Sequence, residues 1–167
     1  VPDQVLGDLY AQVTANQVCG RRLCEFLDDS QLTNLTGLSA ALLERADWAM
    51  REAILAVPDG IYRSELRADG FDEDETHIQC AITIDGSELV IDYTGTSKQI
   101  TRGINCVMNY TDAYSVYPVK CALDPETPRN EGSYRPMKVI APEGCILNPT
   151  RPAPVNARQL TGHLLAG

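Results

Sequence analysis

The side chains best suited to holding a small molecule lie in two short segments of the chain. Arg102, Asn105 and Asn109 belong to the first segment, which reads RGINCVMN, and Arg158 and His163 belong to the second, which reads RQLTGH. Guanidinium and amide groups carry several hydrogen-bond donors, so together they could line a cleft for a polar substrate. These five residues are our substrate-cleft candidates, and no catalytic step is assigned to any of them.

The spacing of the two asparagines allows two interpretations. Asn105 and Asn109 are four residues apart, so on one helix both amides would face the same direction, and Gly103 permits a backbone geometry that exposes its own N–H. The alternative is that the asparagines cap a helix and tie down a loop. His163 likewise has a structural alternative, as a core or interface histidine.

Several catalytic and cofactor-binding motifs are absent from the sequence. No Gly-Lys pair occurs, which excludes a P-loop, and neither G-x-G-x-x-G nor G-x-S-x-G is found. The closest cysteines, Cys19 and Cys24, are spaced wider than C-x-x-C, and His77 and His163 each lack a second histidine at metal-ligand spacing. We therefore expect no nucleotide and no metal to be held by this chain alone.

Two charged segments could be interpreted as ligand-binding sites, but each has a simpler structural explanation. The acidic run Asp69 to Glu75, which reads DGFDEDE, lacks the oxygen-ligand register of an EF-hand and is expected to be a solvated hairpin loop. The segment PRNEGSYRP is expected to pair its own charged residues, Arg129, Glu131 and Arg135, around a glycine turn.

Two helices are expected at the beginning of the chain. Apolar residues recur at spacings of three, four and seven over residues 2–28, and a second such pattern runs from Leu38 to Val57 and stops at Pro58. We expect these helices to form an antiparallel hairpin, joined by a polar link around residues 30–36. Gly7 and Gly20 weaken the first helix, which suggests close approach of another backbone on that face.

Strands and an irregular segment follow the helices. Polar and apolar residues alternate over 62–67 and 78–84, and a type I′ turn at Asp85-Gly86 should lead into a strand over 89–93. Eight of the ten prolines lie after position 117, so the rest should be irregular, with a helix over 108–121, a short strand over 137–140 and a helical pattern beginning at 158. The expected fold class is α+β: a helical hairpin, an antiparallel β-hairpin or small sheet, and an irregular Pro-rich segment with short helices.

Composition limits the class of protein and its partners. A chain of 167 residues with 44% hydrophobic residues can form one domain with a core. Its net charge of −9 repels phosphate backbones and anionic lipids, so neither nucleic acid nor membrane is expected as a partner. No apolar run approaches the roughly 20 residues of a membrane helix, and no signal peptide is apparent. We expect a cytoplasmic protein with free cysteines rather than three disulfides.

Five segments, in this order, resemble the hydantoinase B/oxoprolinase family: LGDLYAQVTANQVCGRRL, GINCVMNYTDAY, PRNEGSYRP, APEGCILNP and PAPVNARQLTGH. They span nearly the whole chain. The resemblance implies a B-type subunit of the kind found in N-methylhydantoinase, 5-oxoprolinase, caprolactamase and acetone or acetophenone carboxylase.

This resemblance also implies a partner and a reaction. Such subunits work with an A-type subunit or domain of actin-like ATPase fold, which uses ATP and magnesium to phosphorylate a carbonyl oxygen and so makes it a better leaving group. For this chain it implies ATP-dependent opening of a cyclic amide, at a substrate site formed with the ATPase partner. The alternatives are a subunit of an ATP-dependent ketone carboxylase and a non-catalytic assembly scaffold.

The resemblance implies as well that important parts of the enzyme lie outside this chain. In metal-containing members, a His- and Asp-bearing segment upstream of the matched region supplies a divalent metal site, so no metal ligand is assigned to any residue here. The chain begins without an initiator Met and ends inside a helical pattern. We expect residues 1–167 to be a single domain or part-domain from the interior of a larger B-type subunit, and to be catalytically silent alone.

Overall fold

The computed structural model describes residues 2–70 and 75–166 and divides into two compact units, Val1–Leu42 and Leu43–Gly167. The first unit contains α1 (Pro2–Asp29) and the opening turns of α2 (Thr36–Leu55), which confirms the two predicted N-terminal helices. Asn34 Oδ1 accepts a hydrogen bond from the N–H of Thr36 at 3.0 Å and so satisfies a free donor where α2 begins. The packing of the helices as a hairpin stays a prediction.

The glycines of α1 lack the close neighbour that the sequence suggested. Among the described residues, no atom of another element lies within 4 Å of where a Cβ on Gly7 or Gly20 would be. A glycine in a helix interior costs about 1 kcal/mol relative to alanine. No backbone contact inside the described part of the chain accounts for that cost at these two positions.

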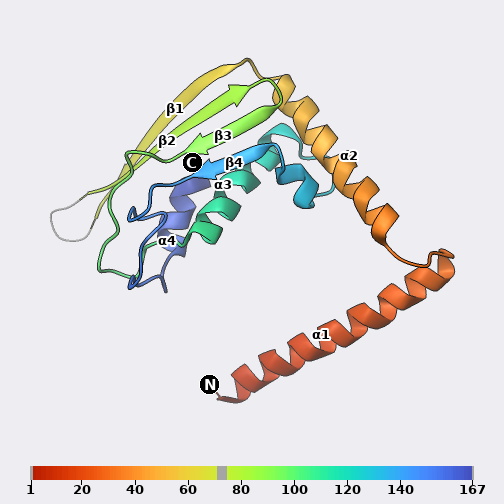
Figure 1. Cartoon of the computed structure of the whole chain (residues 1–167). Helices are drawn as coiled ribbons and strands as arrows, with labels where there is room; N and C mark the ends of the chain where they lie inside the picture. The colour runs from red at the N-terminus through yellow and green to blue at the C-terminus, as the bar shows by residue number, and fades with distance from the viewer. Residues whose placement is uncertain (1, 71–74, 167) are drawn as a thin grey trace. The chain divides into compact units, whose positions relative to one another are not determined.

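A four-stranded sheet in the order β1-β2-β3-β4 forms the base of the second unit (Figure 1). The first three strands, β1 (Gly60–Ala68), β2 (Thr76–Asp85) and β3 (Glu88–Asp92), pair antiparallel, and β4 (Met137–Ile140) pairs parallel with β3. A parallel pair needs a crossover connection. Helix α3 (Met108–Leu123) lies in that connection and on one face of the sheet (Figure 1), so the sheet is mixed rather than wholly antiparallel.

The alternation seen in the sequence separates the two faces of the sheet. In the observed register Ile82 pairs with Ile91, and Ala81, the residue before Ile82, pairs with both Arg63 and Asp92. Neighbouring residues of a strand point to opposite faces, so the isoleucines face α3 and the charged side chains face away. Ile91 is 1% exposed, in agreement with its place on the core face.

The turn between β2 and β3 differs from the prediction by one residue. Asp85 pairs with Glu88, so the central residues of the turn are Gly86 and Ser87 rather than Asp85 and Gly86. Of these two, Gly86 alone has a positive φ, of 57°. A type I′ turn requires positive φ at both central positions, so the predicted turn type is wrong.

The core of the second unit draws on α2, the sheet and the segment after β4. Met50 and Ile54 of α2 are fully buried, as are Ile146 and Leu147 of the Pro-rich segment. All four belong to one hydrophobic cluster with Ile91. The Pro-rich segment is therefore irregular in backbone but contributes directly to the core.

A buried ion pair fixes the loop that follows α3. Lys120 is 3% exposed and donates hydrogen bonds to the backbone oxygens of Asp124 and Thr127. Its Nζ also lies 3.0 Å from Asp124 Oδ2, and Asp124 Oδ1 accepts a hydrogen bond from the N–H of Thr127 at 3.1 Å. Two hydrogen bonds and one close charge contact of Lys120 thus close the loop over the end of the helix.

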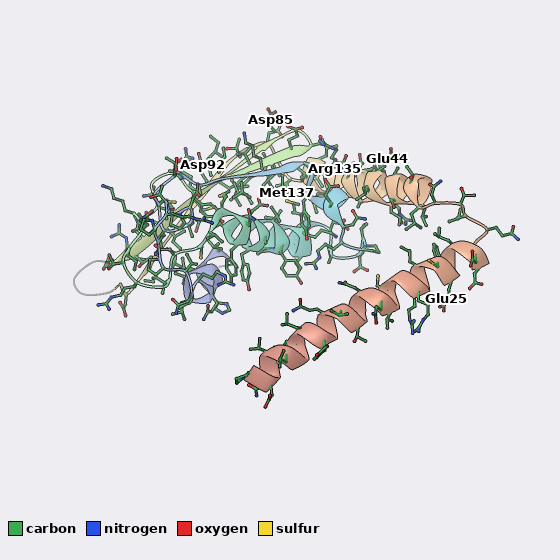
Figure 2. All side chains as sticks on the ribbon, turned by 60° about the horizontal axis from the view of Figure 1, so that its bottom comes forward. Glu25, Glu44, Asp85, Asp92, Arg135 and Met137 are labelled. Atoms are coloured by element: carbon green, nitrogen blue, oxygen red, sulfur yellow. The ribbon has the colours of Figure 1, made fainter. Side chains whose placement is uncertain are left out.

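The ion pairing expected within PRNEGSYRP is confirmed for Arg135 and Glu131, whereas Arg129 lies over the ring of Tyr117, with its Cζ 5.2 Å from the ring centroid. The Nε and Nη2 atoms of Arg135 donate to the two carboxylate oxygens of Glu131 at 3.3 and 3.1 Å. Arg135 also lies beside Glu44 of α2 (Figure 2), and these neighbouring carboxylates raise its pKa. This pairing, together with the first turn of the short helix η1 (Glu131–Tyr134), fixes the approach to β4.

The remaining expectations concern the chain end and the cysteines. Short helices α4 (Gln159–Gly162) and η2 (His163–Ala166) confirm the helical pattern predicted near the C-terminus. All six cysteines are free. None of the helices among the described residues combines the length and apolar character needed to cross a membrane. Residues 71–74 of the acidic run lie outside the described residues.

Candidate functional site

The site candidates gather where the loop before α3 meets the C-terminal segment. The N–H of Ala157 donates to the backbone oxygen of Gly103 at 2.8 Å, and Thr161 Oγ1 donates to that of Ile104 at 2.7 Å. A Cβ on Gly103 would collide with Oδ1 of Asn156, so a larger residue there would force the Asn156 side chain to move. The segments RGINCVMN and RQLTGH are therefore neighbours in space.

Asn105 lies beneath this junction rather than on its surface. The residue is fully buried, and its Nδ2 donates to the backbone oxygens of Ile100, Arg102 and Pro154 at 2.8, 3.0 and 2.9 Å. Its Oδ1 accepts a hydrogen bond from the N–H of Ile100 at 2.9 Å. The side chain thus ties one loop to another, as in the structural alternative given for it.

Asn109 has a different environment from Asn105. Helix α3 begins at Met108, three residues after Asn105, so the two asparagines do not share a helix face. Asn109 is exposed in the first turn of α3. The predicted alignment of the two amides is therefore wrong, because the helix starts too late to include the first of them.

Arg158 is held over an aromatic stack. Its Cζ lies 5.4 Å from the ring centroid of Tyr110, and its Nη1 donates to the backbone oxygen of Val155 at 3.2 Å. Tyr110 in turn stacks on Tyr114, with ring centroids 4.2 Å apart. A Cβ on Gly162 would collide with the Tyr110 ring, so α4 and the tyrosine approach closely. The guanidinium is consequently oriented by the fold, with donors left for a ligand.

The other two candidates also lie on the surface. Arg102 and His163 are both exposed, the first in the loop before α3 and the second at the beginning of η2. The structure thus brings four of the five candidates to the surface around one junction, namely Arg102, Asn109, Arg158 and His163, and assigns the fifth, Asn105, to holding that junction together.

Burial raises the pKa of two groups at the junction. The thiol of Cys106 is fully buried and donates to the backbone oxygen of Arg158 at 3.2 Å; burial raises its pKa to about 11, partly opposed by the Arg158 charge. Partial burial, together with the neighbouring Tyr114, raises the pKa of Tyr110 to about 12. Both groups stay protonated near neutral pH, so neither is a ready nucleophile or base there.

The arrangement favours binding over bond-breaking chemistry. In residues 2–70 and 75–166, no group of three His, Cys, Asp or Glu side chains is placed to hold a metal ion. The resemblance places the metal ligands upstream of this chain, and no step is assigned to a metal here. Arg158 and the exposed amide of Asn109 can instead hold a polar or anionic group.

Two features of this region were not predicted from the sequence. Tyr110, Tyr114 and Tyr117 occur at i, i+4 and i+7 within the predicted helix, so a shared helix face could have been inferred. The buried pair of Lys120 and Asp124 has helical spacing too, but its burial depends on how the following loop folds back, which no local pattern indicates.

With this geometry established, comparison with known proteins identifies the class. Residues 1–166 match the family model Hydantoinase B/oxoprolinase, and the chain belongs to the hydantoinase B/oxoprolinase family. Among its relatives is the B-type subunit of a candidate D-/L-hydantoinase from Pseudomonas sp. (strain NS671), which is 34% identical over 99% of this chain. The chain covers 30% of that relative.

Solved structures agree with the assignment. The ATP-dependent caprolactamase from Pseudomonas jessenii is similar over 90% of this chain and 26% of its own, with a TM-score of 0.81 and 28% identity. An acetone carboxylase matches 68% of this chain and 17% of its own, with a TM-score of 0.59 and 18% identity, which shows the fold alone. The chain thus spans about a third or less of the proteins that it matches.

Proposed function

We propose that this chain is part of the B-type subunit of an ATP-dependent cyclic-amide hydrolase, where it helps form the substrate site with an ATPase partner. The observation that carries the proposal is the difference between its structural matches. A caprolactamase, which by its name acts on a cyclic amide, matches 90% of the chain with a TM-score of 0.81, whereas the acetone carboxylase reaches 68% and 0.59. Cyclic-amide opening is therefore favoured over ketone carboxylation.

The geometry supports a binding role for this chain in that reaction. An amide carbonyl oxygen becomes a good leaving group once ATP has phosphorylated it, and a phosphorylated substrate carries new negative charge. Arg158 is held over Tyr110 at 5.4 Å with guanidinium donors free to meet such a charge. In this proposal Arg102, Asn109 and His163 supply further exposed polar groups around it, while ATP, magnesium and the divalent metal are held by the partner and by an upstream segment.

An assay of the intact complex tests the proposed reaction. The purified complex is supplied with ATP and, in separate reactions, a hydantoin, 5-oxoproline, caprolactam, or acetone with bicarbonate. We expect ATP-dependent ring opening of at least one cyclic amide and no carboxylation of the ketone. A complex that carboxylates acetone and opens none of the rings would show that the alternative, a ketone carboxylase, is correct.

A second experiment separates a substrate-site role from a non-catalytic scaffold. Asn109→Ala and His163→Ala remove exposed side chains, and we expect each to lower kcat/KM by about 3- to 10-fold, the loss typical of one hydrogen bond, with the complex intact by size-exclusion chromatography. Loss of assembly with normal specific activity in the complex that remains would instead support the scaffold.

A further inference from the structure

We propose that β1 pairs antiparallel with β1 of a second copy of this chain, about a two-fold axis at Ser64, so that the two sheets join edge to edge. β1 is an edge strand of its sheet (Figure 1), and it has nine residues where β4, at the opposite edge, has four. A long edge strand presents a row of unpaired N–H and C=O groups to another strand. The inference goes beyond the proposed function, because it depends neither on the reaction nor on the substrate.

The hydrogen bonds of β2 show which backbone groups of β1 are available. The N–H of His77 donates to Ser97 Oγ at 2.9 Å, and its backbone oxygen accepts from the N–H of Ser97 at 2.8 Å, so His77 turns its backbone away from β1. The next residue, Ile78, therefore turns toward β1 and bonds to its register partner Leu66. Because this direction alternates along a strand, every second residue of β1 turns its N–H and oxygen to the outer edge. These are called here the free-edge residues: Ile61, Arg63, Glu65 and Arg67.

Nothing in the described part of the chain occupies this edge. No hydrogen bond from another described residue reaches the backbone of the free-edge residues. All four side chains are exposed as well. The edge can therefore accept a strand without first losing an existing contact of the described residues.

The charges of the free-edge residues select one register between two copies. When all nine residues pair antiparallel, Arg63 lies opposite Glu65 of the second copy, and the two-fold axis repeats this ion pair. Glu65 also lies 3.3 Å from His77 of its own copy, but the two oxygens of a carboxylate can accept from both. A shift of one strand by two residues places either Arg63 or Glu65 opposite its own equivalent, which is unfavourable. A shift by one residue places free backbone groups opposite groups already bonded to β2.

The same register covers apolar side chains that the fold leaves exposed. Ile61 and Tyr62 are 56% and 45% exposed. In the paired strands Ile61 lies opposite Arg67 of the second copy, whose methylene groups can cover it. Tyr62 lies opposite Leu66 of the second copy, on the face of the sheet that carries α3. The sequence of β1 thus complements itself in charge and in apolar contact, and this is why a second copy is the occupant of the edge.

Charge exchange across the axis tests the pairing in the intact protein with its natural subunits, by sedimentation velocity over a series of concentrations. Arg63→Glu and Glu65→Arg each place like charges opposite each other twice, and we expect each to raise the dissociation constant of the pairing by at least about tenfold. The double variant places opposite charges across the axis again and should return to within about threefold of the wild-type value. Lys138→Glu, the same charge change on exposed β4, is the matched control and should have no effect.

Hydrogen exchange, resolved to single N–H groups, locates the pairing at the predicted edge. The N–H groups of the free-edge residues should exchange at least about tenfold more slowly at concentrations above the dissociation constant than below it. Those of Tyr62 and Leu66, already bonded to β2, should not change. This measurement needs no variant, so it decides the question even where a substitution lowers the unfolding midpoint.

Three kinds of result would overturn the proposal. The first is a protein that contains one copy of this chain at every concentration. The second is a pairing that is insensitive to the single charge changes or is not restored by the double variant. The third is slow exchange of the free-edge N–H groups that does not depend on concentration, which would assign the edge to another segment of the protein.

Discussion

Asn105 links two loop segments with a single buried side chain. Replacing it with Ala leaves the N–H and oxygen of Ile100 and the oxygens of Arg102 and Pro154 without that partner inside the fold. We expect Asn105→Ala to lower the free energy of unfolding by about 2–4 kcal/mol, measured by urea denaturation, because a lost buried hydrogen bond costs about 1–3 kcal/mol and several are involved. The exposed control Asn109→Ala should change it by less than about 0.5 kcal/mol; similar losses for both variants would contradict this account of Asn105.

The buried pair of Lys120 and Asp124 leads to a prediction about how the stability of the protein depends on pH. Burial alone would raise the pKa of Asp124, but hydrogen bonds from Lys120 and Thr127 outweigh it and hold the pKa below its ordinary value. A depressed carboxyl pKa stabilises the fold above the unfolded value, about 3.9, and that stabilisation disappears as the pH falls through the folded pKa.

We therefore expect Lys120→Met to cost about 3–5 kcal/mol at pH 7, because it leaves a buried carboxylate unpaired. The difference from the wild-type protein should shrink in urea denaturation as the pH falls below the unfolded carboxyl pKa of about 3.9, because a protonated Asp124 no longer needs the Lys120 charge. Adding Asp124→Asn to the variant should recover part of the loss at pH 7. A difference that stays constant from pH 7 to pH 3 would show that charge burial is not the cause.

At the scale of elements, η1 depends on a close approach to α2. A Cβ on Gly132 would collide with the backbone oxygen of Leu43, which cannot rotate away. We expect Gly132→Ala to destabilise the protein by about 1–3 kcal/mol, the usual cost of overpacking, as a lower midpoint in thermal or urea unfolding. Gly37→Ala in α2 is the matched control, since nothing lies within 4 Å of its Cβ position, and it should be neutral or stabilising by up to about 1 kcal/mol. Equal destabilisation by both would contradict the proposed contact.

Elements set by local pattern were predicted well, and those set by distant contacts were not. The prediction of β4 matches its observed bounds, Met137–Ile140, and the helices begin within a few residues of their predicted starts. The β2–β3 turn was placed one residue early, because Asp85-Gly86 and Gly86-Ser87 are both acceptable turn pairs. The parallel pairing of β4 and the burial of Asn105 depend on where the α3 crossover and residues 154–161 return, which periodicity along the chain does not encode.

The candidate site was only partly predictable for the same reason. The residue types at Arg158 and Asn109 indicated a polar surface, and the structure places both there. The aromatic stack beneath Arg158 joins residues 110 and 158, so it required the fold. Asn105 was misassigned because a spacing of four has meaning only if one helix contains both residues, and α3 begins after Asn105.

At the scale of the whole molecule, this chain corresponds to one part of its larger relatives. It belongs to the hydantoinase B/oxoprolinase family over residues 1–166, yet it covers 30% or less of the relatives described here. Its own groups form a binding surface, and those near the junction with raised pKa values stay protonated at neutral pH. In the proposed function, ATP and the metal therefore come from outside this chain.

The coupling of ATP use to ring opening in the intact complex tests the central claim most directly. ADP and the ring-opened product are quantified over time with a cyclic amide as substrate, with and without ATP. The account predicts equal amounts of ADP and ring-opened product, and no ring opening when ATP is omitted. Ring opening that proceeds without ATP, or ADP formation that accompanies only bicarbonate-dependent carboxylation of a ketone, would contradict it.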